Sequence, residues 1–406
     1  MNAYWLILTL GFCVILSYLY SFISKATRIP SVLLLLITGI GVRLVFGPEL
    51  IRISFVNKIV EVLGIIGLIV IVLEAALDLK ISPEKVTVVR NSFLAAVLVF
   101  FLSVLGITAV LQFFLERSLI KCIVYAIPLS IISSAIIIPS IEHLSEQKKE
   151  FIIYEASFSD IIGILVFNYL TAEAAFSISS IILFGFSIVW AIILSLMISL
   201  ALSYLLSRIR SHVKFVPILT ILLMLYAMGK LLHLPALLII MVFGLLVNNK
   251  ERISLSWVMN VLKTNDSTDN QYFEELLKQL KSITYETSFI VRTFFFILFG
   301  YSIDIQVLTE WEVILIGSSI VGMLLLLRYL YLRYFLRAHV LPELFLMPRG
   351  LITVLLFYSI PQRLQLGSFN NGILFFVILT TSVLMMLGLL LYRADVINLS
   401  DGEQPL

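Results

Sequence analysis

The sequence predicts an all-α polytopic membrane protein of about 13 transmembrane helices. Of its 406 residues, 61% are hydrophobic and 13% are charged, and the mean hydropathy is +1.09. Soluble domains average about 45–50% apolar and about 25% charged residues, so a soluble fold could not bury this much apolar surface. The chain therefore requires a lipid bilayer, and its net charge of +3 gives no reason to expect a nucleic-acid partner.

Apolar segments of spanning length place the predicted helices in order. A transmembrane helix needs about 20 mostly apolar residues. The first apolar segment has no positive region before it, unlike a cleaved signal peptide, so it is predicted to remain as a helix. The predicted spans are residues 3–23, 29–47, 57–77, 91–114, 119–141, 150–171, 179–207, 215–232, 234–249, 286–303, 311–335, 342–361 and 371–392.

The charges between the spans predict the orientation. With the N-terminus outside, 18 of the 28 Lys and Arg residues lie in cytoplasmic loops, 6 lie outside and 4 lie within spans. Cytoplasmic loops carry this excess of positive charge, so we expect a multi-pass protein of the plasma (cytoplasmic) membrane with its C-terminus in the cytoplasm. Its cytoplasmic segments include a loop over 249–285 with a short amphipathic helix, and a tail over 396–406.

Two predicted spans are interrupted in corresponding places. Thirteen spans divide into six, one linker and six, which inverts the second half relative to the first, as in many secondary transporters. The fifth span contains Pro128 and the pair Ser133-Ser134, and the twelfth contains Pro-Arg-Gly at 348–350. Irregular backbone at membrane depth is tolerated where it lines a cavity, so the two breaks predict an ion or substrate site.

Asp160 lies inside the sixth predicted span. A carboxylate at that depth costs about 2.5–3.5 kcal/mol on insertion scales and is kept where it faces an ion path or a partner. Ser157 shares the helix face of Asp160, and the adjacent Ser159 is a further candidate ligand. Glu155 lies about 140° around the helix, so it faces another neighbour. The alternative is that both carboxylates are structural and lie in internal pairs.

Two arginines late in the chain lie within predicted spans. Arg328 lies too deep for a loop residue, and a buried cation needs a carboxylate partner, for which Glu155 is the candidate. The alternative for Arg328 is snorkelling toward the cytoplasm. Arg349 lies at the Pro-Gly break, where its charge can compensate freed carbonyls and helix ends. The alternative for Arg349 is an interfacial anchor.

Three further side chains are candidates for the same cavity. Glu74 lies about one turn inside the end of the third span, deep enough to reach it. Ser133 and Ser134 offer hydroxyl groups at the break in the fifth span. A serine in a membrane helix can instead bond back to a carbonyl of its own helix, and that alternative stays open for both.

Several motifs together resemble the monovalent cation/proton antiporter superfamily, the sodium/hydrogen exchanger family. Residues 28–40 resemble the family's second-helix pattern, and residues 73–78 resemble its Phe-Glu-Ala-Gly-Leu stretch. Glu155 and Asp160 have the spacing of the family's glutamate and asparagine-aspartate motif. Arg328 and the later Arg349-Gly350 resemble its two late arginines, so the resemblance covers nearly the whole chain.

The resemblance implies a homodimer and an elevator-type alternating-access cycle. A dimerisation part (about 1–90 and 175–305) would support a mobile core part (about 91–171 and 311–392) within one transmembrane domain over 1–395. The two broken helices would cross in the core. Asp160 would bind the monovalent cation, Na⁺ or K⁺, and the proton. Glu155 and Arg328 would form a structural salt bridge, and Glu74 would help to coordinate the ion.

The chain departs from the family pattern at the break in the fifth span. Exchangers usually have Thr-Asp-Pro there, whereas this chain has Ser133-Ser134 without an acid, as in the potassium-efflux branch. Ala156 replaces a serine and Ser159 replaces an asparagine. With a single titratable carboxylate at the crossover, we expect electroneutral one-for-one exchange. The alternative is an exchanger-fold potassium-efflux or sensor protein with altered or lost exchange.

Two other classes fit the sequence less well. A membrane enzyme is disfavoured because the four histidines lie at helix ends without metal or haem spacing, and no Gly-flanked nucleophilic serine is present. An organic-anion symporter of similar fold would want uncharged crossover helices without Asp160. We therefore expect a transporter that is not an enzyme and needs no cofactor.

Overall fold

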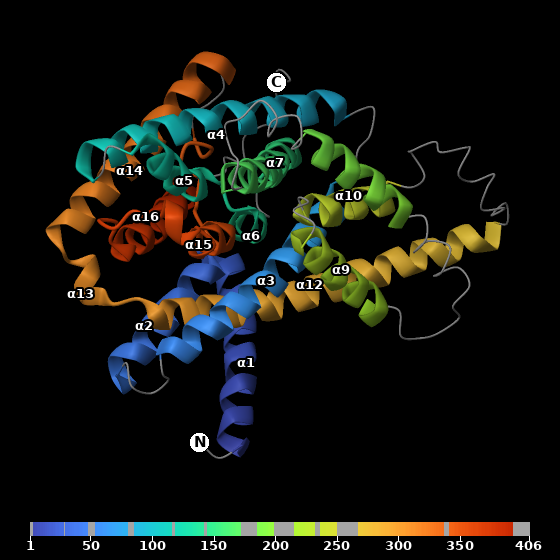
Figure 1. The fold of residues 1–406 in the computed structure, drawn as a ribbon. Coiled ribbons are helices and arrows are strands. Elements are labelled where there is room, and N and C mark those ends of the chain that lie inside the picture. Colours follow the sequence, from blue (N-terminus) through green and yellow to red (C-terminus); the bar gives the residue numbers. More distant parts are fainter. Residues whose placement is uncertain are drawn as a thin grey trace. The chain divides into compact units, whose positions relative to one another are not determined.

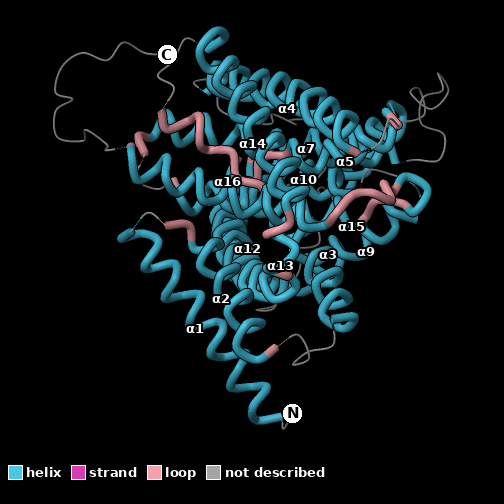
Figure 2. The backbone as a smooth tube through the Cα atoms, turned by 90° about the vertical axis from the view of Figure 1, so that its left-hand side faces the viewer, coloured by secondary structure: helices cyan, strands magenta, loops and turns pink. Residues whose placement is uncertain are grey.

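Helices make up nearly all of the described chain (Figures 1 and 2). A computed structural model describes residues 3–27, 29–47, 53–79, 85–115, 118–141, 144–171, 185–198, 215–231, 236–249, 267–336 and 341–392. Over these residues the chain forms helices and connecting segments but no strand, so the all-α prediction is confirmed. Both ends of the seventh predicted span, much of the predicted 249–285 loop and the 396–406 tail lie outside the described residues.

Six stretches of the described residues are long and apolar enough to cross a membrane. Shorter apolar helices accompany them, among them one over Gly185–Ile198. The polytopic membrane character agrees with the sequence, whereas the count of thirteen helices and their 6+1+6 arrangement stay predictions. The six stretches are Ile7–Ser24, Val86–Phe114, Leu119–Ser140, Leu277–Ser302, Trp311–Phe335 and Asn371–Leu391.

The chain divides into two compact units, residues 1–64, 90–167 and 292–406 in the first, and residues 65–89 and 168–291 in the second. The predicted core and dimerisation parts follow other boundaries and stay a prediction. The first unit contains all or most of α1 (Ala3–Thr27), α2 (Ser31–Phe46), α4 (Val86–Phe114), α5 (Leu119–Ser130), α6 (Ser134–Ile137), η2 (Ile138–Ser140), α7 (Glu146–Thr171), α13 (Ile305–Leu308), α14 (Trp311–Leu330), η3 (Tyr331–Leu336), α15 (Leu351–Tyr358), η4 (Gln362–Leu364) and α16 (Asn371–Leu391).

Small residues allow the helices of the first unit to approach closely. Gly39 of α2 faces Gly300, near the end of α12 (Ser267–Ser302), and a Cβ added to Gly39 would lie only 2.9 Å from the Gly300 Cα atom. Gly317 of α14 leaves room for the ring of Phe376 on α16, and these two helices pack together (Figure 1). Van der Waals packing at small residues is a main source of helix association in lipid.

The second unit contains the end of α3 (Ile53–Asp78), the helix over Gly185–Ile198, α9 (Phe215–Leu231), α10 (Ala236–Asn248) and the start of α12. Gly229 of α9 packs against Ala236 of α10. Gly244 of α10 packs against Ala76 of α3. The unit is therefore assembled through the same kind of small-residue contact as the first.

Two predicted segments differ from the structure. Residues 267–285, predicted to hold a turn and a separate amphipathic helix, form the first turns of the continuous helix α12 (Figure 1). No proline lies between residues 267 and 302, and the first glycine is Gly300, so nothing breaks this helix earlier. The twelfth predicted span, 342–361, is helical only over α15, because turns occupy residues 341–345 and residues 346–350 have no regular secondary structure.

Candidate ion-binding site

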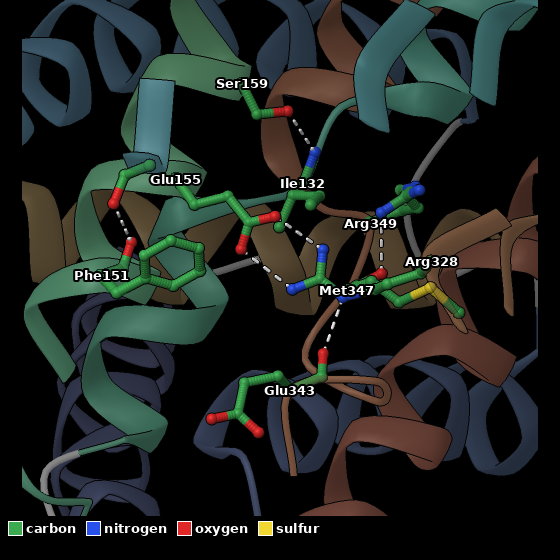
Figure 3. Close-up of polar contacts among 9 residues, drawn as sticks. Ile132, Phe151, Glu155, Ser159, Arg328, Glu343, Met347 and Arg349 are labelled. Atoms are coloured by element: carbon green, nitrogen blue, oxygen red, sulfur yellow. Dashed lines mark hydrogen bonds and ion pairs between the residues drawn. The ribbon is translucent and has the colours of Figure 1, made fainter. Parts of the chain in front are cut away.

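The fifth predicted span is broken into two half-helices in the structure. α5 ends at Ser130, residues 131–133 are non-helical, and α6 begins at Ser134. Pro128 has no backbone N–H to donate, which weakens the last turn of α5. The backbone N–H of Ile132 lies in this non-helical segment and donates to the Ser159 hydroxyl of α7 at 3.0 Å (Figure 3). A side chain of α7 therefore replaces the missing helical acceptor.

The second break lies directly against the first. Residues 346–350 have no regular secondary structure before α15 begins at Leu351. The Ser133 N–H donates to the Pro348 carbonyl at 2.9 Å, which joins the two breaks through their backbones. A Cβ added to Gly350 would lie 2.9 Å from the Ser133 Cβ atom, so only glycine allows this approach. The two interruptions predicted from the sequence therefore meet at one place.

Arg349 is buried at this meeting point, with 1% of its surface exposed. Its Nε donates to the Leu129 carbonyl at 2.6 Å, and its Nη1 donates to the Met347 carbonyl at 2.8 Å. Leu129 lies in the last turn of α5, where carbonyls lose their helical partners and carry partial negative charge. The backbone N–H of Arg349 donates to the Thr381 hydroxyl of α16 at 3.1 Å. The guanidinium thus lies where freed carbonyls need compensation.

Asp160 projects from α7 toward the first break. Its side chain is buried, and its Oδ2 accepts a hydrogen bond from the Ser134 hydroxyl, on the first residue of α6. Its Oδ1 is buried and makes no hydrogen bond to any described residue. A buried carboxylate oxygen without a partner is costly, so this half of the carboxylate needs an explanation.

Two more oxygens near Asp160 are in the same state. The hydroxyls of Ser133 and Ser157 are buried and have no hydrogen-bond partner among the described residues. Ser133 is adjacent to Ser134, and Ser157 lies one turn before Asp160 on α7. One carboxylate oxygen on α7, one hydroxyl on the same helix face and one hydroxyl at the first break are therefore buried without a partner among the described residues, and such hard oxygens suit an alkali cation better than a soft metal.

Glu155, about 140° around α7 from Asp160, contacts Arg328 of α14 (Figure 3). The pair is bidentate: Arg328 Nη1 lies 2.9 Å from Glu155 Oε1, and Nη2 lies 3.0 Å from Oε2. Arg328 Nε donates to the Glu343 carbonyl at 2.7 Å. Both side chains are buried, at 2% and 1% exposure, so this charge pair is fully enclosed and fully bonded.

Glu74 belongs to the second unit, whereas the other predicted site residues belong to the first. Its carboxylate accepts a hydrogen bond from Ser288 of α12. One turn later, Asp78 accepts a hydrogen bond from Tyr285. The role of Glu74 as an ion ligand stays a prediction. The role of Ser159 as a ligand also stays a prediction. In the structure its oxygen accepts the hydrogen bond from the Ile132 N–H.

Sequence reasoning missed the backbone carbonyls that bind the two arginines, those of Leu129, Met347 and Glu343. It also missed Thr381. Carbonyl groups carry no signal in a sequence, because every residue has one. Thr381 could have been found only from the requirement that the backbone N–H groups at a break in a membrane-spanning helix be hydrogen-bonded.

Comparison with known proteins identifies the fold and the family. A structure of the sodium proton antiporter MjNhaP1 from Methanocaldococcus jannaschii at pH 8 is similar with a TM-score of 0.70 and 18% identity, over 96% of this chain and 99% of that one. An electron-microscopy structure of the same antiporter is similar with a TM-score of 0.68 and 18% identity, over 97% of this chain and 99% of that one. No curated protein sequence matches significantly. The family model described as sodium/hydrogen exchanger, transmembrane, matches residues 11–391, and the chain therefore belongs to the sodium/hydrogen exchanger family.

Proposed function

We propose that this protein exchanges a monovalent cation for a proton across the membrane, with Asp160 as the shared binding residue. The observation that carries the proposal is the group of unpartnered oxygens, Asp160 Oδ1 and the hydroxyls of Ser133 and Ser157, buried beside two helix breaks. A dehydrated cation would give all three oxygens a partner. The similar structure is that of a sodium proton antiporter, which supports the same chemistry.

Competition for Asp160 couples the two ions. The carboxylate is neutral with a proton and is neutralised by a bound cation, whereas the empty carboxylate keeps a negative charge. Moving that bare charge through the hydrocarbon core is costly, so only the neutralised core crosses. Asp160 alternates between one proton and one cation, and Ser134 supplies a hydroxyl where relatives have an acid. Exchange is therefore one for one and electroneutral.

The two breaks suit an elevator-type cycle. The contacts from Ser133 to Pro348 and from Arg349 to Leu129 bind the two interrupted segments to each other. The segments would therefore move as one body that carries Asp160. In this proposal the body moves past a dimerisation part, within a homodimer.

Everted membrane vesicles test the function directly. Fluorescence dequenching after a pulse of Na⁺, K⁺ or Li⁺ should report proton movement and identify the cation. Asp160→Asn should abolish the signal while the protein is still found in the membrane. Electroneutral exchange should be insensitive to an imposed membrane potential. A wild-type protein that moves no protons with any of the three cations would favour the sensor alternative.

A further inference from the structure

A second charged pair lies on the face of α7 that carries Glu155. Lys148 precedes Glu155 by seven residues, two helical turns or about 10.5 Å along the axis, so the two side chains share one face. Lys148 Nζ lies 3.2 Å from Glu343 Oε1. This face of α7 therefore bears two ion pairs in succession, Lys148 with Glu343 and Glu155 with Arg328.

Glu343 belongs to both pairs through different groups. Its backbone carbonyl accepts the hydrogen bond from Arg328 Nε, whereas its carboxylate points away from Arg328 (Figure 3). That carboxylate is held by Lys148, whose ammonium also lies 5.2 Å from the centroid of the Tyr392 ring. The side chains of Lys148 and Glu343 are 21% and 10% exposed, so water screens this pair less than a surface pair.

The backbone after Glu343 leads directly to the ion site. We name residues 343–350 the arm. Along the arm, Met347 accepts from Arg349, Pro348 accepts from Ser133, and Gly350 packs against Ser133. The arm contains no regular helix, so side-chain and backbone contacts outside it must fix its position. At its first residue those contacts are Lys148 and Arg328.

We propose that Lys148 and Glu343 are positioning residues for ion binding: their pair fixes the start of the arm against α7, and the arm in turn holds Ser133, the neighbour of the Ser134 that bonds Asp160. The inference rests on the proposed exchange function and adds two residues to it. Neither residue touches the cation. Their loss should loosen the site, which lowers the affinity for the cation more than the rate of transport.

The chain offers a matched control at the next residue of the same helix. Lys149 pairs with Glu146 at 3.7 Å, and the Glu146 side chain is 82% exposed. Lys149→Met removes the same charge from the same turn of α7. That surface pair contributes little, so the control should leave transport unchanged.

The experiment measures exchange against cation concentration in everted vesicles for wild type, Lys148→Met, Glu343→Gln, the charge swap Lys148→Glu with Glu343→Lys, and Lys149→Met. The half-saturating cation concentration should rise about threefold to tenfold in the two single variants, which corresponds to loss of a partly screened pair. The maximal rate should stay within about a factor of two. The charge swap should restore most of the affinity.

A normal half-saturating concentration in both single variants, with active wild type, would overturn the inference and leave the proposed function intact. A lower melting temperature without a change in affinity would also overturn it, because that result describes a purely structural pair. A wild type without cation-driven proton movement would overturn the proposed function itself. If Lys148→Met fails to fold, the half-saturating cation concentrations of Glu343→Gln and of the charge swap test the inference instead.

Discussion

The two buried carboxylates of α7 have opposite surroundings, although they are five residues apart. Glu155 bonds through both oxygens to Arg328, and that arginine is further bonded to the Glu343 carbonyl. Asp160 bonds through one oxygen to Ser134, and its other oxygen, like the hydroxyls of Ser133 and Ser157, has no hydrogen-bond partner among the described residues. The Glu155–Arg328 pair has no free oxygen for another ligand. The unpartnered oxygen of Asp160 can still accept one. The difference separates a charge that holds helices together from a charge that can bind a cargo.

Stability should separate the two carboxylates most strongly. Arg328→Met leaves Glu155 buried without a partner and should destabilise the protein by about 3–5 kcal/mol. Asp160→Asn keeps an acceptor for Ser134 and removes a half-bonded charge, so its melting temperature should equal or exceed that of the wild type. Thermal unfolding in detergent micelles measures both.

A double variant checks this assignment of the ion pair. Replacing both charges, Arg328→Met with Glu155→Leu, should recover much of the lost stability, because no unpaired charge remains. If Arg328→Met unfolds at the wild-type temperature, the pair does not hold the fold.

The hydroxyls beside Asp160 should have an intermediate effect, on affinity. Ser133→Ala and Ser157→Ala each remove one oxygen from the proposed cation shell. Each should raise the half-saturating cation concentration about threefold to tenfold, as expected for loss of one modest polar contact. Ser130→Ala is the matched control, because its buried hydroxyl donates to Ala126 of its own helix. Equal effects in all three variants would remove the two serines from the site.

Ser159 should have the smallest effect on transport, because it acts on stability alone. Ser159→Ala leaves the Ile132 N–H at the break without an acceptor and should destabilise the protein by about 1–3 kcal/mol. Cation affinity should stay within about a factor of two of wild type. A large loss of affinity at wild-type stability would instead make Ser159 a ligand.

Local geometry and the cost of charge in lipid were readable from the sequence. The helical angle between Glu155 and Asp160 predicted different neighbours, and Pro128 and Gly350 predicted the breaks. The contact of Lys148 with Glu343 could not be read, because Lys148 lies in a predicted loop, where a charge does not need a partner. The continuous α12 was missed because the polar composition of its first turns resembles that of a loop. Their helix propensity and the lack of a helix-breaking residue favour a helix instead.

Proton release on cation binding tests the central claim most directly. Purified protein in weakly buffered detergent solution should release up to about one proton per chain when the transported cation is added, because ligand and proton compete for the same carboxylate. Ser130→Ala should release the same amount, and Asp160→Asn should release none. Equal proton release from Asp160→Asn and wild type would contradict the account.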